Sequence, residues 1–204
     1  MNGSIKVLHV DDEPALLDQA KIFLEKEEEK LDVTTAQSPR KALELLEKED
    51  FDVIVSDYQM PDMDGLEFLE EVREERESDI PFIIFTGKGR EEVAMEALNL
   101  GADRYLQKGG DPKAQFGVLA DAIMQEYGYF EKNRELERSE REKSKILDST
   151  AELIVYQNEK HEVLWANQAA SDSVDEEPED LEGRKCYEIW HGREEPCEGC
   201  PVQR

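Results

Sequence analysis

The stretch FDVIVSDYQMPDMDG, residues 51–65, contains the pattern that decides the fold. Its first part, FDVIV at 51–55, is an apolar run of the kind found in strands that are buried on both faces of a parallel sheet. The run leads directly to Asp57, and open α/β sheets hold their sites at the carboxyl ends of such strands. Pro61 and Gly65, which follow, predict a loop and then a helix. We therefore interpret Asp57 as the reacting group.

Strands and helices alternate along the chain on both sides of this stretch. Apolar strand patterns are each followed by a helix with apolar residues at helical spacing, the last helix being a long one that begins near Pro112. This alternation predicts a parallel sheet with helices on both faces and right-handed crossovers. The strand at 31–35 is the weakest and is expected near an edge. The predicted strands are 5–10, 31–35, 51–55, 80–85 and 103–107.

The amino-acid composition of the chain argues against several classes of function. The chain has 204 residues, with 51 acidic and 25 basic side chains and a net charge of −26. Such a charge opposes direct binding to nucleic acid or to an anionic membrane, because phosphate contacts need clustered Lys and Arg. No apolar run approaches the roughly 20 residues of a membrane span, and the amino terminus lacks the plan of a signal peptide. We expect a cytoplasmic protein without direct nucleic-acid or membrane partners.

Polar side chains follow four of the predicted strands at one edge of the sheet. Asp11 and Asp12 follow the first strand and Asp57 the third, while Thr86 and Lys108 end the fourth and fifth. Three neighbouring carboxylates repel one another unless a cation lies among them, and Mg²⁺ prefers oxygen ligands. The set suits phosphoryl transfer to Asp57. Taken singly, each of these residues could instead be an ordinary polar residue of a loop, a surface charge or a helix cap.

Residues 4 to about 127 resemble the receiver domain of two-component response regulators. The resemblance rests on VDDEP (10–14), SDYQMPDMDG (56–65), IIFTG (83–87) and YLQK (105–108). It implies a flavodoxin-like (βα)5 fold, phosphorylation by a sensor histidine kinase and a Mg²⁺ cofactor. The protein would then be a phosphoacceptor switch and not otherwise an enzyme. It would catalyse only its own phosphorylation and, if it does so at all, its own dephosphorylation.

The resemblance also assigns roles to individual residues. Asp57 would be the phosphoacceptor, and Lys108 would contact the phosphoryl group. Thr86 and Tyr105 would form the switch pair, in which the hydroxyl turns toward the phosphoryl group and the aromatic ring moves inward. The implied Mg²⁺ ligands are Asp11, Asp12, Asp57 and the backbone carbonyl of Gln59. One departure is that Gly109 and Gly110 follow the lysine, where the family usually has proline, so the loop is predicted to be more flexible.

The rest of the chain predicts two further parts. We place the receiver at 1–127, a helical linker at 128–146 and a small α+β piece at 147–204. The linker is highly charged with sparse apolar positions, so it is either a solvated spacer or a short coiled coil. Residues 149–174, STAELIVYQNEKHEVLWANQAASDSV, resemble the opening of a PAS sensory domain, whose last three strands are not present in this sequence. Two strands are expected, near 153–156 and 163–165.

The end of the chain carries a second candidate metal site. Cys186, His191, Cys197 and Cys200 form C-x4-H-x5-C-x2-C, which could bind Zn²⁺ or an iron–sulfur cluster. The alternative is a buried small Cys186 beside two free thiols. An odd number of cysteines without an export signal argues against disulfides. Of the other histidines, His9 is expected in the core and His161 at the surface of a turn.

Three outputs are compatible with this organisation. The first is a change in protein–protein contacts through the last receiver helices and the PAS-like piece, with a homodimer as the expected assembly. The second is transcriptional regulation through a DNA-binding partner, since the sequence has neither a helix-turn-helix nor a basic patch. The third makes the chain the amino-terminal fragment of a hybrid sensor kinase.

Overall fold

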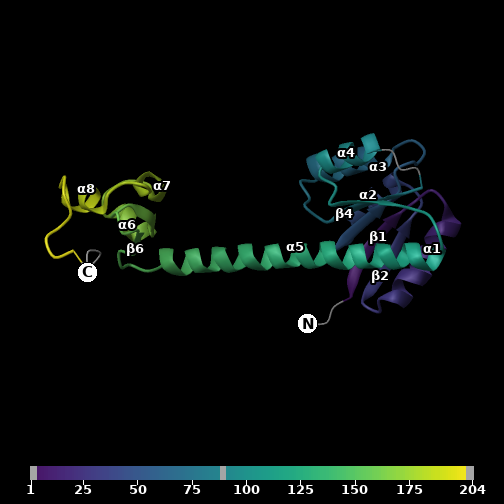
Figure 1. Ribbon diagram of the computed structural model, residues 1–204, viewed down its shortest axis with the longest axis horizontal. Helices are drawn as coiled ribbons and strands as arrows, with labels where there is room; N and C mark the ends of the chain where they lie inside the picture. Colours follow the sequence, from purple (N-terminus) through teal and green to yellow (C-terminus); the bar gives the residue numbers. More distant parts are fainter. Residues whose placement is uncertain (1–3, 88–90, 201–204) are drawn as a thin grey trace. The chain divides into compact units, whose positions relative to one another are not determined.

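The computed structural model describes residues 4–87 and 91–200 of the chain. The chain divides into two compact units, Met1–Asn133 and Arg134–Arg204. The first contains a five-stranded parallel sheet with the strand order β2-β1-β3-β4-β5. Figure 1 shows this sheet with helices around it. This confirms the predicted doubly wound α/β fold and the edge position of the second strand. The strands are β1 (Ile5–Val10), β2 (Leu31–Ala36), β3 (Val53–Ser56), β4 (Phe82–Thr86) and β5 (Arg104–Gln107).

Helices cover both faces of this sheet, because successive residues of each buried strand point to opposite sides. On one face, Leu8 and Ile54 belong to a core that includes residues of α2, α3 and α4. On the other face, Val7 and Val53 pack with residues of α1 and the first part of α5. The helical elements of this unit are α1 (Pro14–Glu27), α2 (Pro39–Leu46), α3 (Gly65–Glu70), the π-helical turn η1 (Glu71–Glu75), α4 (Glu91–Asn99) and α5 (Pro112–Asp148).

His9 lies inside β1 and is fully buried, as predicted. Neither of its ring nitrogens has a hydrogen-bond partner within the described residues. Burial lowers the pKa of His9 to about 3, the charge of Lys108 adds to the effect, and Asp57 opposes it. The imidazole is therefore neutral at physiological pH and acts as part of the core.

The long helix predicted from Pro112 is present as α5, which runs to Asp148 and covers the whole of the predicted linker. Its first part is anchored in the core of the first unit through Phe116, Leu119 and Ile123. Its later part is exposed and carries ion pairs four residues apart, such as Arg138 with Glu142, which add only a few tenths of a kcal/mol each. None of the described helices combines the length and apolarity that crossing a membrane requires.

The second unit contains a two-stranded antiparallel sheet, so the two strands predicted there are present. Val163 and Ala166 of β7 pack with Ala170 and Leu181 in a small core. The strands are β6 (Val155–Gln157) and β7 (Val163–Ala166), and the helices are α6 (Gln168–Asp172), α7 (Pro178–Leu181) and α8 (Cys186–His191).

One buried side chain joins the end of α5 to this small core. The amide nitrogen of Asn167 donates to the carbonyl oxygens of Leu147 and Glu152, at 3.0 and 2.9 Å. Its amide oxygen accepts from the backbone N–H groups of Ile154 and Ala170, at 2.9 and 3.1 Å. A single amide thus satisfies backbone groups from the last turn of α5, the approach to β6 and the first turn of α6.

His161 corrects one sequence-based prediction. It lies in the turn between β6 and β7, as expected, but only 6 % of its surface is exposed, so its assignment to the surface is wrong. Its ring packs edge-on against Tyr187, with the ring centroids 5.8 Å apart. The sequence shows only the local turn, whereas the burial comes from α8, which lies more than twenty residues later.

Candidate functional site

The site is built from two buried carboxylates at neighbouring strand ends. Val10 of β1 and Ser56 of β3 are paired in the sheet register, so the residues that follow them, Asp11 and Asp57, emerge side by side. The backbone N–H of Asp57 donates to the carbonyl of Val10 at 2.8 Å and fixes this arrangement. Asp11 is 1 % exposed and Asp57 6 % exposed. Two such carboxylates need a compensating positive charge.

Lys108 supplies that charge from the end of β5. Its Nζ lies 2.6 Å from Oδ2 of Asp11 and 2.8 Å from Oδ1 of Asp57. Its backbone N–H donates to the carbonyl of Thr86 at 2.7 Å, which ties it to β4. Burial would lower the pKa of Lys108, but the hydrogen bonds and negative charges of the two carboxylates outweigh it and raise the pKa. The lysine is therefore a fixed ammonium between the two acids.

Backbone N–H groups hold the remaining carboxylate oxygens. Oδ2 of Asp57 accepts from the N–H of Gln59 at 2.9 Å, and Oδ1 of Asp11 accepts from the N–H of Glu13 at 2.8 Å. In each carboxylate, one oxygen therefore contacts the ammonium of Lys108 and the other accepts a hydrogen bond from a backbone N–H of the loop that follows it. Asp12, which was predicted beside them, has an exposed side chain. The structure brings together Asp11, Asp57 and Lys108, and it leaves Asp12 at the surface next to them.

The predicted switch residues lie beside this group on the sheet. Thr86 ends β4 and is buried, and Tyr105 lies on β5 with intermediate exposure. Tyr105 pairs with Ile84, and Gln107 pairs with Thr86. Because side chains alternate along a strand, Thr86 and Tyr105 emerge on the same face of the sheet. Their position suits a coupled movement, and their role as a switch remains a prediction.

A close backbone contact fixes the loop that follows Asp57. A Cβ on Gly65 would lie 2.3 Å from the carbonyl oxygen of Asp57 and 2.9 Å from the Cα of Tyr58. Only glycine permits this approach. Asp64 caps α3 through the N–H groups of Leu66 and Glu67, and the carboxylate of Glu67 accepts from the N–H of Asp64. The sequence indicates a loop and a helix here but not that the loop closes onto the backbone of Asp57.

The loop after Lys108 contains the two glycines in place of the usual proline. None of the peptide bonds among the described residues is cis. Gly110 has φ of +84°, in the region that favours glycine. The N–H of Gly109 donates to the side-chain oxygen of Gln115 at 3.0 Å. The loop is thus joined to the start of α5.

Comparison with known proteins identifies this unit. Residues 7–117 match the family model described as the response regulator receiver domain. The chain belongs to this family. The response regulator SaeR of Staphylococcus aureus (strain NCTC 8325 / PS 47) is 38 % identical over 107 residues, which cover 52 % of this chain and 45 % of SaeR. The chain therefore spans about half the length of the curated relatives it matches.

Solved receiver structures agree with the fold of this unit. A response regulator receiver domain from Clostridium thermocellum is 29 % identical, with a TM-score of 0.54, over 62 % of this chain and 97 % of that chain. The chemotaxis protein CheY4 of Vibrio cholerae, crystallised at low pH, is 32 % identical, with a TM-score of 0.52, over 57 % of this chain and 97 % of that one. The family match ends at residue 117, so the PAS-like nature of residues 147–204 remains a prediction.

Receiver domains generally bind Mg²⁺ at the phosphorylation site, and this donor set fits the ion. Asp11 and Asp57 offer hard carboxylate oxygens in a buried position that needs a cation. The carbonyl of Gln59 follows Asp57 in the same loop. In residues 4–87 and 91–200, no group of three or more His, Cys, Asp or Glu side chains is arranged to hold a metal ion. Lys108 is the cation that the two carboxylates share in this structure.

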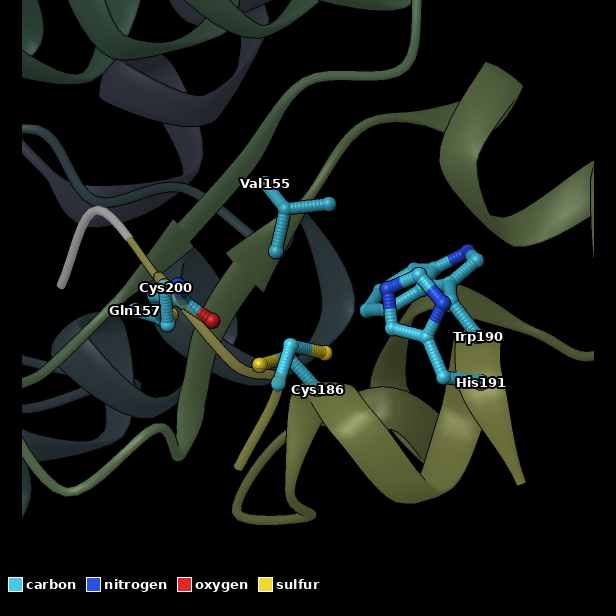
Figure 2. A pocket seen from close by; sticks show the side chains of 7 residues that line it. Val155, Gln157, Cys186, Trp190, His191 and Cys200 are labelled. Atoms are coloured by element: carbon cyan, nitrogen blue, oxygen red, sulfur yellow. The ribbon is translucent and has the colours of Figure 1, made fainter. Parts of the chain in front are cut away.

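The second predicted metal set lies at a pocket in the second unit (Figure 2). The pocket has a volume of about 310 Å³, and all four predicted residues contribute to its lining. The three thiols are partly buried, whereas His191 is exposed. The lining residues are Val155, Gln157, Cys186, Trp190, His191, Cys197 and Cys200.

Proposed function

We propose that this protein is a response regulator in which Asp57 accepts a phosphoryl group from a sensor histidine kinase. The observation that carries the proposal is the buried Asp11–Lys108–Asp57 group, because it holds one carboxylate next to a fixed positive charge. A side-chain oxygen of Asp57 attacks phosphorus in line, the phosphorus–nitrogen bond of a phosphohistidine breaks, and the imidazole leaves. The product is an aspartyl phosphate.

The neighbouring residues each have a part in this transfer. Asp11, Asp57, the carbonyl of Gln59 and, from its exposed position, Asp12 would hold Mg²⁺, which supplies charge neutralisation on the phosphoryl oxygens when bound. Lys108 keeps its ammonium directed at the reacting carboxylate and gains the phosphoryl oxygens as new acceptors. The hydroxyl of Thr86 can then donate to the same phosphoryl group.

Incubation with a small phosphodonor such as acetyl phosphate and Mg²⁺ tests the acceptor. Intact-mass measurement should show the gain of one phosphoryl group on the wild type and none on Asp57→Asn, which keeps the size of the side chain but removes the nucleophilic carboxylate. Asp62→Asn is the matched control, because Asp62 is exposed in the same loop at φ +68°, which asparagine also tolerates. Loss of phosphorylation in the control, or its retention in Asp57→Asn, would contradict the assignment.

The output we favour is a change in protein–protein contacts at the α4–β5–α5 face. Met95 and Leu98 of α4 and Val118 of α5 are large apolar side chains that are more than half exposed. Tyr105 lies on β5 between these helices in the chain, so its movement would alter the same face. A homodimer formed through this face, or through α5, fits the exposed apolar side chains.

Hydrodynamic mass with and without beryllofluoride, which mimics the phosphoryl group, tests this output. We expect the apparent mass to increase toward that of a dimer on addition of beryllofluoride and Mg²⁺. The double variant Met95→Glu/Val118→Glu should remain monomeric, because it places charges in the proposed interface. A monomer under all conditions would exclude phosphorylation-driven dimerisation. Tight DNA binding at physiological salt would instead favour direct transcriptional regulation.

A further inference from the structure

Four potential metal ligands come together in the second unit from three separate segments. His161 lies in the turn between β6 and β7, Cys186 begins α8, and Cys197 and Cys200 lie in the turn that follows α8. Sγ of Cys200 is 3.8 Å from Nδ1 of His161. The backbone N–H of Cys186 donates to the carbonyl of His161 at 3.0 Å, which keeps these two segments in contact.

The structure assigns to these residues a zinc site made of His161, Cys186, Cys197 and Cys200. Three thiolates and one imidazole form one of the donor sets found in tetrahedral structural Zn²⁺ sites. In such a site, bonds of about 2.3 Å to sulfur and 2.1 Å to nitrogen put these two atoms about 3.6 Å apart. The observed 3.8 Å between Sγ of Cys200 and Nδ1 of His161 is close to this expected distance.

The turn at Cys197 suits chelation by both of its thiols. The backbone N–H of Cys200 donates to the carbonyl of Cys197 at 3.1 Å, so residues 197–200 form a β-turn that brings their two side chains near each other. Binding still requires closure, since no three of these groups already surround a common point among the described residues.

The three thiols contribute to the lining of a single pocket in this unit. Burial raises the pKa of Cys186, and the nearby sulfurs of Cys200 and Cys197 raise it further. Thiolates that gather in this way repel one another, and a divalent cation removes the repulsion while displacing the protons.

His161 rather than His191 completes the set. His191 follows Cys186 by five residues on α8, which places the two side chains about 140° apart around the helix axis. It is exposed, and it lines the same pocket as Trp190 (Figure 2). His161, by contrast, is buried at φ +64°, where glycine or asparagine would be the easier choice for a simple turn. On this assignment His161 is the nitrogen ligand, in place of the His191 of the pattern C-x4-H-x5-C-x2-C.

Metal binding by the full chain provides the test. The protein is reduced, freed of metal with a chelator, and titrated with Zn²⁺ against a competing chelator, and then with Co²⁺ as a spectroscopic probe. We expect one equivalent of Zn²⁺, and for Co²⁺ a tetrahedral spectrum with a thiolate charge-transfer band. His161→Asn, which tolerates the positive φ, and Cys186→Ser should weaken binding at least about 100-fold, whereas His191→Asn should bind as the wild type does.

Several outcomes would overturn this assignment. The first is that Zn²⁺ does not bind stoichiometrically, and the second is that His191→Asn loses binding while His161→Asn keeps it. The others are that the protein purifies with iron and sulfide in place of zinc, or that a disulfide persists under reducing conditions. The circular dichroism of each variant shows whether it is folded, and its phosphorylation shows whether the receiver is intact. Asp57→Asn should bind Zn²⁺ normally, so the result is independent of the proposed function of the receiver.

Discussion

Replacing Lys108 with methionine should lower the free energy of unfolding by about 3 kcal/mol at neutral pH in the presence of EDTA. The reason is that the substitution removes the ammonium between Asp11 and Asp57, leaving two buried carboxylates without a counter-charge. Mg²⁺ should then stabilise the variant more than it stabilises the wild type, because the ion would take over the neutralisation. Urea unfolding followed by circular dichroism, with and without Mg²⁺, measures both effects.

Lys41→Met is the matched control for this experiment. Lys41 also pairs with a carboxylate, that of Glu44 at 2.9 Å, but both side chains are more than half exposed. Such a solvent-exposed pair contributes little to stability, and it has no reason to respond to Mg²⁺. If the two lysine variants lost the same small amount of stability, the buried pair of carboxylates would not depend on Lys108. If Mg²⁺ stabilised Lys108→Met no more than the wild type, the carboxylates would not form the ion's site.

Gly65→Ala should have a comparably large effect, on stability and on phosphorylation together. The added methyl group would overlap the carbonyl oxygen of Asp57 and the Cα of Tyr58, which are backbone atoms and cannot rotate away. We expect a loss of about 1–3 kcal/mol in the free energy of unfolding. Because the relief of this overlap must move the backbone of Asp57, phosphorylation by acetyl phosphate should slow at least tenfold. Unfolding and intact-mass time courses measure the two effects.

Gly128→Ala separates the crowding at Gly65 from the general effect of adding a methyl group. Gly128 lies inside α5, and a Cβ there would meet nothing within 4 Å. Alanine should stabilise this helical position by about 0.5–1 kcal/mol and leave phosphorylation unchanged. Wild-type phosphorylation in Gly65→Ala would mean that the loop tolerates the methyl group without moving the acceptor.

Much of the receiver could be predicted from its sequence, because its buried strands are short apolar runs with strong boundaries. The first predicted strand has the bounds of β1, Ile5–Val10, and Pro112 begins α5 as expected. The run at 51–55 was placed slightly early, since β3 begins at Val53 and includes Ser56. The topology then brings Asp11, Asp57 and Lys108 together without further assumptions.

What the sequence could not provide are contacts between distant segments. The burial of His161 depends on α8 and on the turn at Cys200, and neither lies near it in the sequence. The sequence does not show that Asp12 stays exposed while Asp11 is buried, because the two carboxylates are adjacent and chemically identical. The need for glycine at position 65 also appears only once the backbone of Asp57 lies against it.

Asn167 has a mechanical consequence for how a signal could enter the second unit. Its amide holds carbonyl groups at the end of α5 and N–H groups at the approach to β6 and the start of α6, all from one fully buried position. If the last turn of α5 rotated about its axis, it would have to displace β6 and α6 or break these buried hydrogen bonds. Asn167 therefore links the end of α5 to the approach to β6 and the start of α6 through its hydrogen bonds.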